Sequence, residues 1–218
     1  MQLLLTRSYV RVYIVINTHT MQSTQVYQIL KPPRDHHALI YTALLSSLAK
    51  TIIRQAETEV TAKKDSAGPL AVVAFNLLQR LPDFDQVFFA KLVQRVGGWP
   101  VPCTLPQADY DGRPWRDEEE KIKVMGFRTL YDEKGRERKE SEAEYAIRVS
   151  GIMRVYFSIL RIRTSEMPCP MFRMPRVWTW FARVMGEMRT LENVAGAEVI
   201  YSEFVLNRDA RSNFLQLH

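Results

Sequence analysis

The stretch LAVVAFNLLQR, residues 70–80, decides the fold of this 218-residue chain. It is almost wholly apolar, and it follows the turn DSAG at 65–68 and Pro69, a residue type favoured at the first position of a helix. A helix that is apolar around its whole circumference is buried against other elements. We therefore expect residues 70–80 to form a central helix of a helical domain.

A long amphipathic helix is predicted before this central segment. From His36 to near Lys63, apolar residues recur mostly at every third or fourth position, a spacing that gathers them on one face of a helix. The sequence therefore predicts one core-facing stripe, with a charged face away from it. The stripe consists of Leu39, Ile40, Ala43, Leu44, Leu48, Ile52, Ala56 and Val60, and away from it lie Lys50, Arg54, Glu57 and Thr61.

A third helix is predicted directly after the central one. Pro82 interrupts the chain, and Asp83 is of a residue type that caps helix N-termini. The segment FDQVFFAKLVQRV, residues 84–96, then runs to Gly97 and Gly98, a common C-terminal signature. These boundaries predict a helix over 84–96.

The second half of the chain is also mostly helical in pattern. Residues 99–117 predict a long loop, an acidic helix follows from about 117 to 125, and FRTLY with RERKE (127–140) predicts a small hairpin or a charged loop. Ser141 and Glu144 form a capping-box pattern that opens a helix. The expected helices are EAEYAIRVSGIMRVYFSILRIR (142–163), VWTWFARVMGEM (177–188) and LENVAGAEVIYSEFVL (191–206).

These elements predict an all-α fold, a HEAT-like stack of antiparallel helices with a loop or hairpin insertion near 99–140. We expect residues 1–35 to be a leader outside the domain, most simply an unstructured one, since no sheet partner is evident for its β-leaning composition. The helical domain is expected over 36–206, and a disordered tail over 207–218.

The charge of the chain favours an anionic partner. Lys and Arg outnumber Asp and Glu by 30 to 24, which suits nucleic acid, a phosphorylated small molecule or an acidic protein surface. Two basic pairs are spaced four residues apart, Lys50 with Arg54 and Lys91 with Arg95. Like charges at this spacing repel on one helix face. If the fold brings both pairs together, they predict a pocket for a polyanion.

No residue set predicts catalysis. The sequence holds no glycine-rich phosphate loop, no GxSxG elbow and no histidine pair at metal-ligand spacing. The two cysteines, Cys103 and Cys169, also lack such a spacing, which favours a reducing intracellular setting. The longest apolar run, 70–75, is far shorter than a membrane span. We therefore expect a binding or regulatory protein without metal, catalytic residue or membrane insertion.

Five segments together resemble the C-terminal domain of the Gle-one mRNA export mediator family, a nucleoporin family. They occur in the same order and with compatible spacing, and QAETEV followed by a PLAVV-type helix is the most specific part. The segments are IIRQAETEV (52–60), SAGPLAVVAF (66–75), FFAKLVQR (88–95), SGIMRVYFSILR (150–161) and VWTWFARVMG (177–186). The family's N-terminal half has no counterpart, and the leader at 1–35, if it is not disordered, is expected to be foreign to the family. The family's C-terminal helices are expected to be partly missing.

The resemblance implies a fold and a role. The fold implied is a HEAT-like stack, similar to the middle domain of translation initiation factor four-G. The role implied is in mRNA export at the cytoplasmic face of the nuclear pore complex, with the protein in nucleus and cytoplasm. The implied ligand is inositol hexakisphosphate, a tether and not a catalytic cofactor. The implied partners are a DEAD-box RNA helicase whose ATPase it activates, nucleoporins, and translation initiation and termination factors, with only indirect RNA contact.

The resemblance also implies the ligand-binding residues. The family's inositol phosphate pocket falls on Lys50, Arg54, Lys91, Gln94 and Arg95. Gln94 stands where the family commonly has a lysine, and Arg54 where a histidine can occur. Two alternatives remain open at this point. Arg54 could pair with Glu57 while Lys91 is solvated, or the chain could be a helical scaffold that binds RNA or protein directly, without an inositol phosphate.

Overall fold

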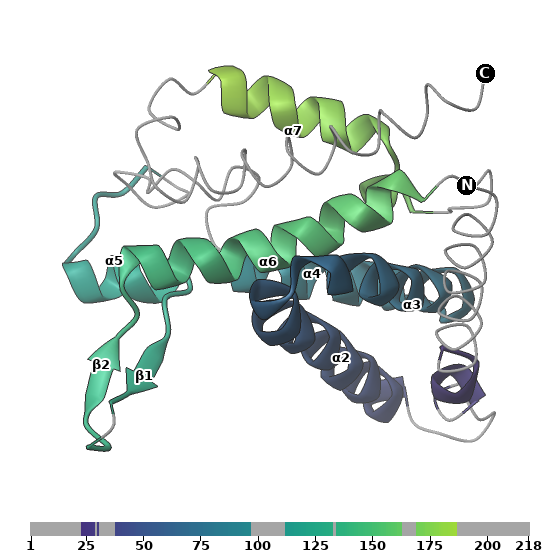
Figure 1. Ribbon diagram of the computed structural model, residues 1–218, viewed down its shortest axis with the longest axis horizontal. Coiled ribbons are helices and arrows are strands. Elements are labelled where there is room, and N and C mark those ends of the chain that lie inside the picture. Colours follow the sequence, from purple (N-terminus) through teal and green to yellow (C-terminus); the bar gives the residue numbers. More distant parts are fainter. Residues whose placement is uncertain are drawn as a thin grey trace, which may run out of the picture.

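The computed structural model describes residues 23–28, 30, 38–96, 112–132, 134–162 and 169–186 (Figure 1). These residues form helices and one small hairpin, which confirms the all-α class and the insertion expected near 99–140. The elements are α2 (Ala38–Gln55), the π-helical turn η1 (Ala56–Val60), the 3-10 turn η2 (Lys64–Ser66), α3 (Ala67–Arg80), α4 (Phe84–Val96), α5 (Glu118–Val124), β1 (Thr129–Tyr131), β2 (Glu137–Lys139), α6 (Glu142–Arg161), the 3-10 turn η3 (Pro170–Phe172) and α7 (Pro175–Gly186).

Helix α6 is the central helix. It runs across the middle of the molecule in Figure 1, with α2, α3 and α4 on one side and α7 on the other. Nearly every residue from Tyr145 to Leu160 is buried, as expected of a helix enclosed on all sides. Helix α3, predicted as the central one, instead packs along α6 and leaves some of its residues half-exposed.

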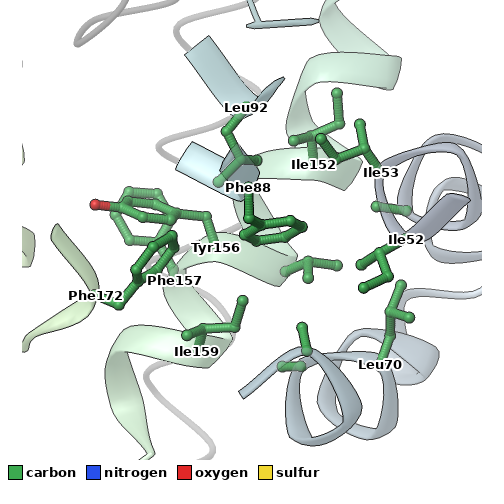
Figure 2. Close-up of a cluster of buried hydrophobic side chains, with 14 of the residues drawn as sticks. Ile52, Ile53, Leu70, Phe88, Leu92, Ile152, Tyr156, Phe157, Ile159 and Phe172 are labelled. Carbon is green, nitrogen blue, oxygen red and sulfur yellow. The ribbon is translucent and has the colours of Figure 1, made fainter. Parts of the chain in front are cut away.

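The hydrophobic core lies where α2, α3, α4 and α6 meet. Phe88 of α4 lies near the middle of the cluster in Figure 2, between Ile52 of α2 and Tyr156 of α6. Phe88 is only 1% exposed, and its ring centroid lies 5.9 Å from that of Phe172 in η3. Burial of such large apolar side chains contributes roughly 1.5–3 kcal/mol each, so this cluster holds the helix stack together.

The predicted stripe of α2 is confirmed only in its C-terminal half. Ile52, Ala56 and Val60 are buried. At the other end of the stripe Leu39 is 72% exposed and Ile40 52% exposed. The residues of α2 that are buried begin only at Leu45, and they are Leu45, Ala49, Ile52 and Ile53. The helix start at 36 and end near 63 are confirmed within two or three residues.

A close approach between helices explains the glycine in α6. A Cβ atom built at Gly151 would lie 2.7 Å from the carbonyl oxygen of Ala56 and 2.6 Å from Oγ1 of Thr61. Only a residue without a side chain therefore lets α6 pack directly onto the π-helical turn η1. This contact fixes where η1 lies relative to α6.

The hairpin and its connection to α6 follow the predicted turn chemistry. Strands β1 and β2 pair antiparallel, with Leu130 opposite Arg138. The capping box is confirmed: Oγ of Ser141 accepts from the backbone N–H of Glu144, and the Glu144 carboxylate accepts from the backbone N–H of Ser141. The hairpin therefore ends directly at the start of the central helix.

Part of the expected leader is folded. Residues 23–28 are helical, Ser23 is fully buried, and Arg80 of α3 donates to the Thr24 hydroxyl at 3.1 Å. An unstructured leader is therefore wrong for these residues. The domain boundaries at 35 and 206 stay predictions. The predicted helix at 191–206 and the tail at 207–218 lie outside the described residues, as does most of the 99–117 loop.

Candidate functional site: a basic surface over a buried carboxylate

The first basic pair lies on the surface of α2. Lys50 and Arg54 are exposed, one turn apart on the same helix face. Neither side chain forms an ion pair with another of the described residues, although the carbonyl oxygen of Arg54 accepts a hydrogen bond from the Thr58 hydroxyl. Both charges are therefore available to a ligand.

The second basic group lies in the last turns of α4. Lys91 is half-buried, and its Nζ donates to Oε1 of Gln94 at 3.0 Å. Arg95 is paired differently: its Nε donates to Oε1 of Glu57 at 2.7 Å, and its Nη2 to Oε2 of Glu57 at 3.3 Å. The Arg95 side chain remains 40% exposed, whereas that of Glu57 is 1% exposed.

Glu57 is the centre of an ionic network that the sequence pattern did not predict. Besides Arg95, its carboxylate accepts from Nη2 of Arg128 and, at 3.3 Å, from Nη1 of Arg148. Arg148 also donates from Nε and Nη2 to the second buried carboxylate, Glu140, at 2.7 and 2.8 Å. We call these five residues (Glu57, Arg95, Arg128, Glu140 and Arg148) the Glu57 cluster.

The Glu57 cluster ties four parts of the fold together. Glu57 comes from η1, Arg95 from α4, Arg128 from the start of the hairpin, and Arg148 from α6. Arg148 further donates to the backbone carbonyls of Arg95 and Gly126. Burial by itself lowers the pKa of Arg148, but the hydrogen bonds and charge of Glu140 and the charge of Glu57 outweigh it and raise that pKa. The buried guanidinium is therefore charged at any physiological pH.

The position of Glu57 corrects two sequence-based expectations. The sequence pattern predicts Glu57 on the charged face away from the apolar stripe, and Glu57 is buried instead. The alternative in which Arg54 pairs with Glu57 is also wrong, because arginines from α4, the hairpin segment and α6 bind this carboxylate. Lys91, expected to be solvated in that alternative, is half-buried against Gln94.

The five predicted ligand residues fall on two helices that pack side by side, α2 and α4. The Arg95–Glu57 ion pair joins the C-terminal end of α4 to η1, one turn beyond Arg54. Lys50 and Arg54 lie on the exposed face of α2, and Glu57 is buried in the π-helical turn η1 that directly follows α2. Arg128 and Arg148 were missed, although an arginine such as Arg148 inside an apolar helix signals a buried acidic partner.

The charges of this arrangement suit an anionic ligand. Three guanidinium groups face two carboxylates in the Glu57 cluster, which leaves the cluster with one net positive charge. Among the described residues, no group of three His, Cys, Asp or Glu side chains could hold a metal ion. In the same part of the chain, none of the helices is both long and apolar enough to span a lipid bilayer.

Solved structures with a similar fold are known. Two of them contain S. cerevisiae Gle1 bound to IP6 and to the C-terminal domain of a Dbp5 variant. In the second of these structures, Gle1 is itself a variant in which arginine replaces a histidine. The first has a TM-score of 0.69 at 21% identity, the second 0.67 at 22%, and each alignment covers 92% of this chain and 67% of that chain. They show that this chain has the same helical fold.

Curated relatives are similar in sequence. The mRNA export factor gle1 of *Schizosaccharomyces pombe* is 29% identical over 171 residues, 78% of this chain and 31% of that protein. The mRNA export factor GLE1 of *Saccharomyces cerevisiae* is 30% identical over 132 residues, 59% of this chain and 21% of that protein. This chain therefore spans only about a fifth to a third of their length. The family model described as GLE1-like protein matches residues 11–201. With that match over most of its length, the chain belongs to the family of GLE1-like proteins.

Proposed function

We propose that this chain is an mRNA export factor that binds inositol hexakisphosphate and a DEAD-box RNA helicase, and that it activates the ATPase of that helicase. The relatives named mRNA export factor support the process, and the neighbours bound to Dbp5 and IP6 support the ligand and the partner. The inositol phosphate is a tether between the two proteins, and the chain has no catalytic role of its own. Site residues are Lys50, Arg54, Lys91, Gln94 and Arg95.

The observation that carries this proposal is the Arg95–Glu57 ion pair. It joins the C-terminal end of α4, which carries Lys91 and Arg95, to η1, which directly follows the helix that carries Lys50 and Arg54. In this proposal the cations of both helices bind the same ligand. Each charge-assisted hydrogen bond to a phosphate contributes about 1.5–3 kcal/mol. Four cations and the Gln94 amide suit a ligand with several phosphate groups better than one with a single phosphate.

The wider assignments rest on the family alone. We propose nucleoporins and translation initiation and termination factors as further partners, and the cytoplasmic face of the nuclear pore complex, with nucleus and cytoplasm, as the location. Contact with RNA is indirect in this proposal, through the helicase.

Thermal unfolding with and without inositol hexakisphosphate tests the pocket. At about a hundred times its dissociation constant, a ligand that binds only the folded state stabilises it by about 2.7 kcal/mol. We expect a clear rise of the midpoint for the wild type and a much smaller one for the double variant K50A/K91A.

A matched control removes two exposed positive charges elsewhere. Lys134 in the hairpin turn and Arg161 at the far end of α6 are exposed and form no ion pair with the described residues. K134A/R161A should keep the full ligand-induced shift. An absent shift in the wild type, or equal shifts in K50A/K91A and the wild type, would contradict the pocket.

The second candidate function is a helical scaffold that binds RNA directly, which the exposed, unpaired Lys50 and Arg54 also suit. Phosphate contacts of this kind give an RNA affinity that falls steeply with salt. Under this alternative, RNA binding is strong at low salt and is not displaced by inositol hexakisphosphate. Competition between the two ligands, or no RNA binding at all, favours the first proposal.

A further inference from the structure

The Glu57 cluster holds more positive charge than its carboxylates require. Arg128 and Arg148 alone neutralise Glu57 and Glu140, and both of these arginines already bind Glu57. Arg95 adds a third guanidinium, which is the most exposed of the three at 40%, against 26% for Arg128 and 6% for Arg148. The excess charge therefore lies at the solvent edge of the cluster, on the residue proposed to bind phosphate.

Arg95 is held on one edge and open on the other. Its Nε and Nη2 bind the two oxygens of Glu57, and within the described residues its Nη1 has no acceptor. The backbone beneath it is fixed too, because Arg148 donates to the carbonyl oxygen of Arg95, and Tyr145 donates to that of Val96. A planar guanidinium fixed in this way presents its remaining N–H groups in one direction.

From this geometry we infer that Glu57 is a positioning residue of the anion site: it orients Arg95 so that the outer N–H groups face the phosphate ligand. The inference rests on the proposed function and deepens it. Ordering a long side chain on binding costs about 0.5–1.5 kcal/mol, and Glu57 removes that cost by holding Arg95 in place before the ligand arrives. Glu57 itself, buried and anionic, does not touch the ligand.

The test changes the reach of the carboxylate and keeps its charge. E57D shortens the side chain by one carbon–carbon bond, about 1.5 Å, so the hydrogen bonds to Arg95 are lost or redirected while the net charge of the cluster stays the same. The matched control E140D makes the same change in a cluster residue that binds Arg148 and the backbone of Arg128, but not Arg95. The dissociation constant for inositol hexakisphosphate is measured by calorimetry, well below the unfolding midpoint of each variant.

We expect E57D to weaken binding about three- to tenfold and E140D to leave the dissociation constant unchanged, although both lower the unfolding midpoint. In the R95A background E57D should have no further effect on affinity, because Glu57 acts only through Arg95. If E57D leaves the affinity unchanged, if E140D weakens it equally, or if the E57D loss persists in full beside R95A, Glu57 is a structural residue only.

A second variant keeps the test open if E57D does not fold. R95K retains the charge, but its single ammonium group cannot both pair with Glu57 and face the ligand, so we expect R95K to lose nearly as much affinity as R95A. Wild-type affinity in R95K overturns the inference and leaves the proposed function standing. No binding by the wild type overturns the proposed function, and the inference with it.

Discussion

The two basic pairs of this chain have the same spacing in sequence and opposite environments in the structure. Lys50 and Arg54 lie on the exposed side of α2 and form no ion pair with the described residues. Lys91 binds Gln94, and Arg95 binds the buried carboxylate of Glu57. The first pair offers exposed charges to a ligand, whereas the second offers groups that hydrogen bonds within the protein already orient.

The difference follows from what lies beneath each pair. Lys50 and Arg54 lie on the exposed side of α2, whose opposite side places Ile52 and Ile53 in the core. Beneath Arg95 lies Glu57, which cannot remain charged in a buried position without cations and hydrogen bonds around it. The orientation of Arg95 at the surface is therefore set by Glu57, a buried residue of another helical segment.

The largest expected effect comes from removing the charge of Glu57, which makes the environment of Arg95 different from that of Lys50 and Arg54. E57Q leaves the partly or fully buried guanidinium groups of Arg95, Arg128 and Arg148 around a neutral amide, whose NH2 group also opposes their N–H donors. Breaking a buried ion pair from one side costs about 3–5 kcal/mol. Chemical denaturation of the variant should show a loss of this size in the free energy of unfolding.

Glu59 is the matched control for this change. It lies two residues further along η1, is exposed, and accepts a hydrogen bond from Gln55 at 2.9 Å. E59Q should change the free energy of unfolding by no more than about 0.5 kcal/mol. Equal losses in E57Q and E59Q would mean that the Glu57 cluster contributes no specific stability.

A smaller effect is expected when Arg95 and Arg54 are each replaced by alanine and the free energies of unfolding are compared. R95A removes two charge-assisted hydrogen bonds to Glu57, which keeps Arg128 and Arg148 as partners, so we expect a loss of about 1–3 kcal/mol. R54A removes an exposed side chain that forms no ion pair with the described residues, so the change should stay within about 0.5 kcal/mol. Both variants are compared by thermal and chemical unfolding without ligand. If R54A costs as much as R95A, the contrast between the pairs is wrong.

Helix boundaries could be predicted from sequence because local chemistry sets them. Helix α4 runs from Phe84 to Val96, the bounds that the sequence pattern predicts. Ser141 with Glu144 begins α6 through side-chain hydrogen bonds within one turn. The exposure of Leu39 and Ile40 could not be predicted in this way. Periodicity shows which face of a helix is apolar, but the length over which a neighbouring helix covers that face depends on tertiary packing.

The basic residues of the proposed site could be identified from the sequence, but their ion-pair partners could not. Spacing identified Lys50 with Arg54 and Lys91 with Arg95, because residues four apart share a helix face. The partner of Arg95 lies 38 residues earlier, and Arg148 lies 91 residues after Glu57. Such contacts are set by how η1 and α6 meet at Gly151, which no local pattern describes.

The smallest expected effect is that of E144Q, which tests whether a carboxylate–arginine pair at the surface stabilises the fold as the buried one does. Glu144 accepts from both Nη atoms of Arg138, at 2.7 and 2.6 Å, and from Ser141, and these contacts lower the pKa of Glu144 from 4.5 to about 2. A carboxylate with a lowered pKa stabilises the fold above its unfolded pKa, and this contribution is lost as the pH falls towards 2. E144Q should thus be slightly less stable than the wild type at neutral pH, and the gap should close between about pH 5 and pH 2.

Unfolding midpoints of both proteins across this pH range measure that gap, and solvent screening keeps it well below the effect of E57Q. Glu142 serves as the control, since it is exposed in the same first turn of α6 and forms no ion pair with the described residues. The difference in unfolding midpoint between E144Q and the wild type could stay constant with pH, or E142Q could show the same difference. Either result would show that proximity to the helix start, and not the Arg138 pair, stabilises this carboxylate. The exposed pair would then resemble Lys50 and Arg54, whose charges do little for the fold, more than it resembles the Glu57 cluster.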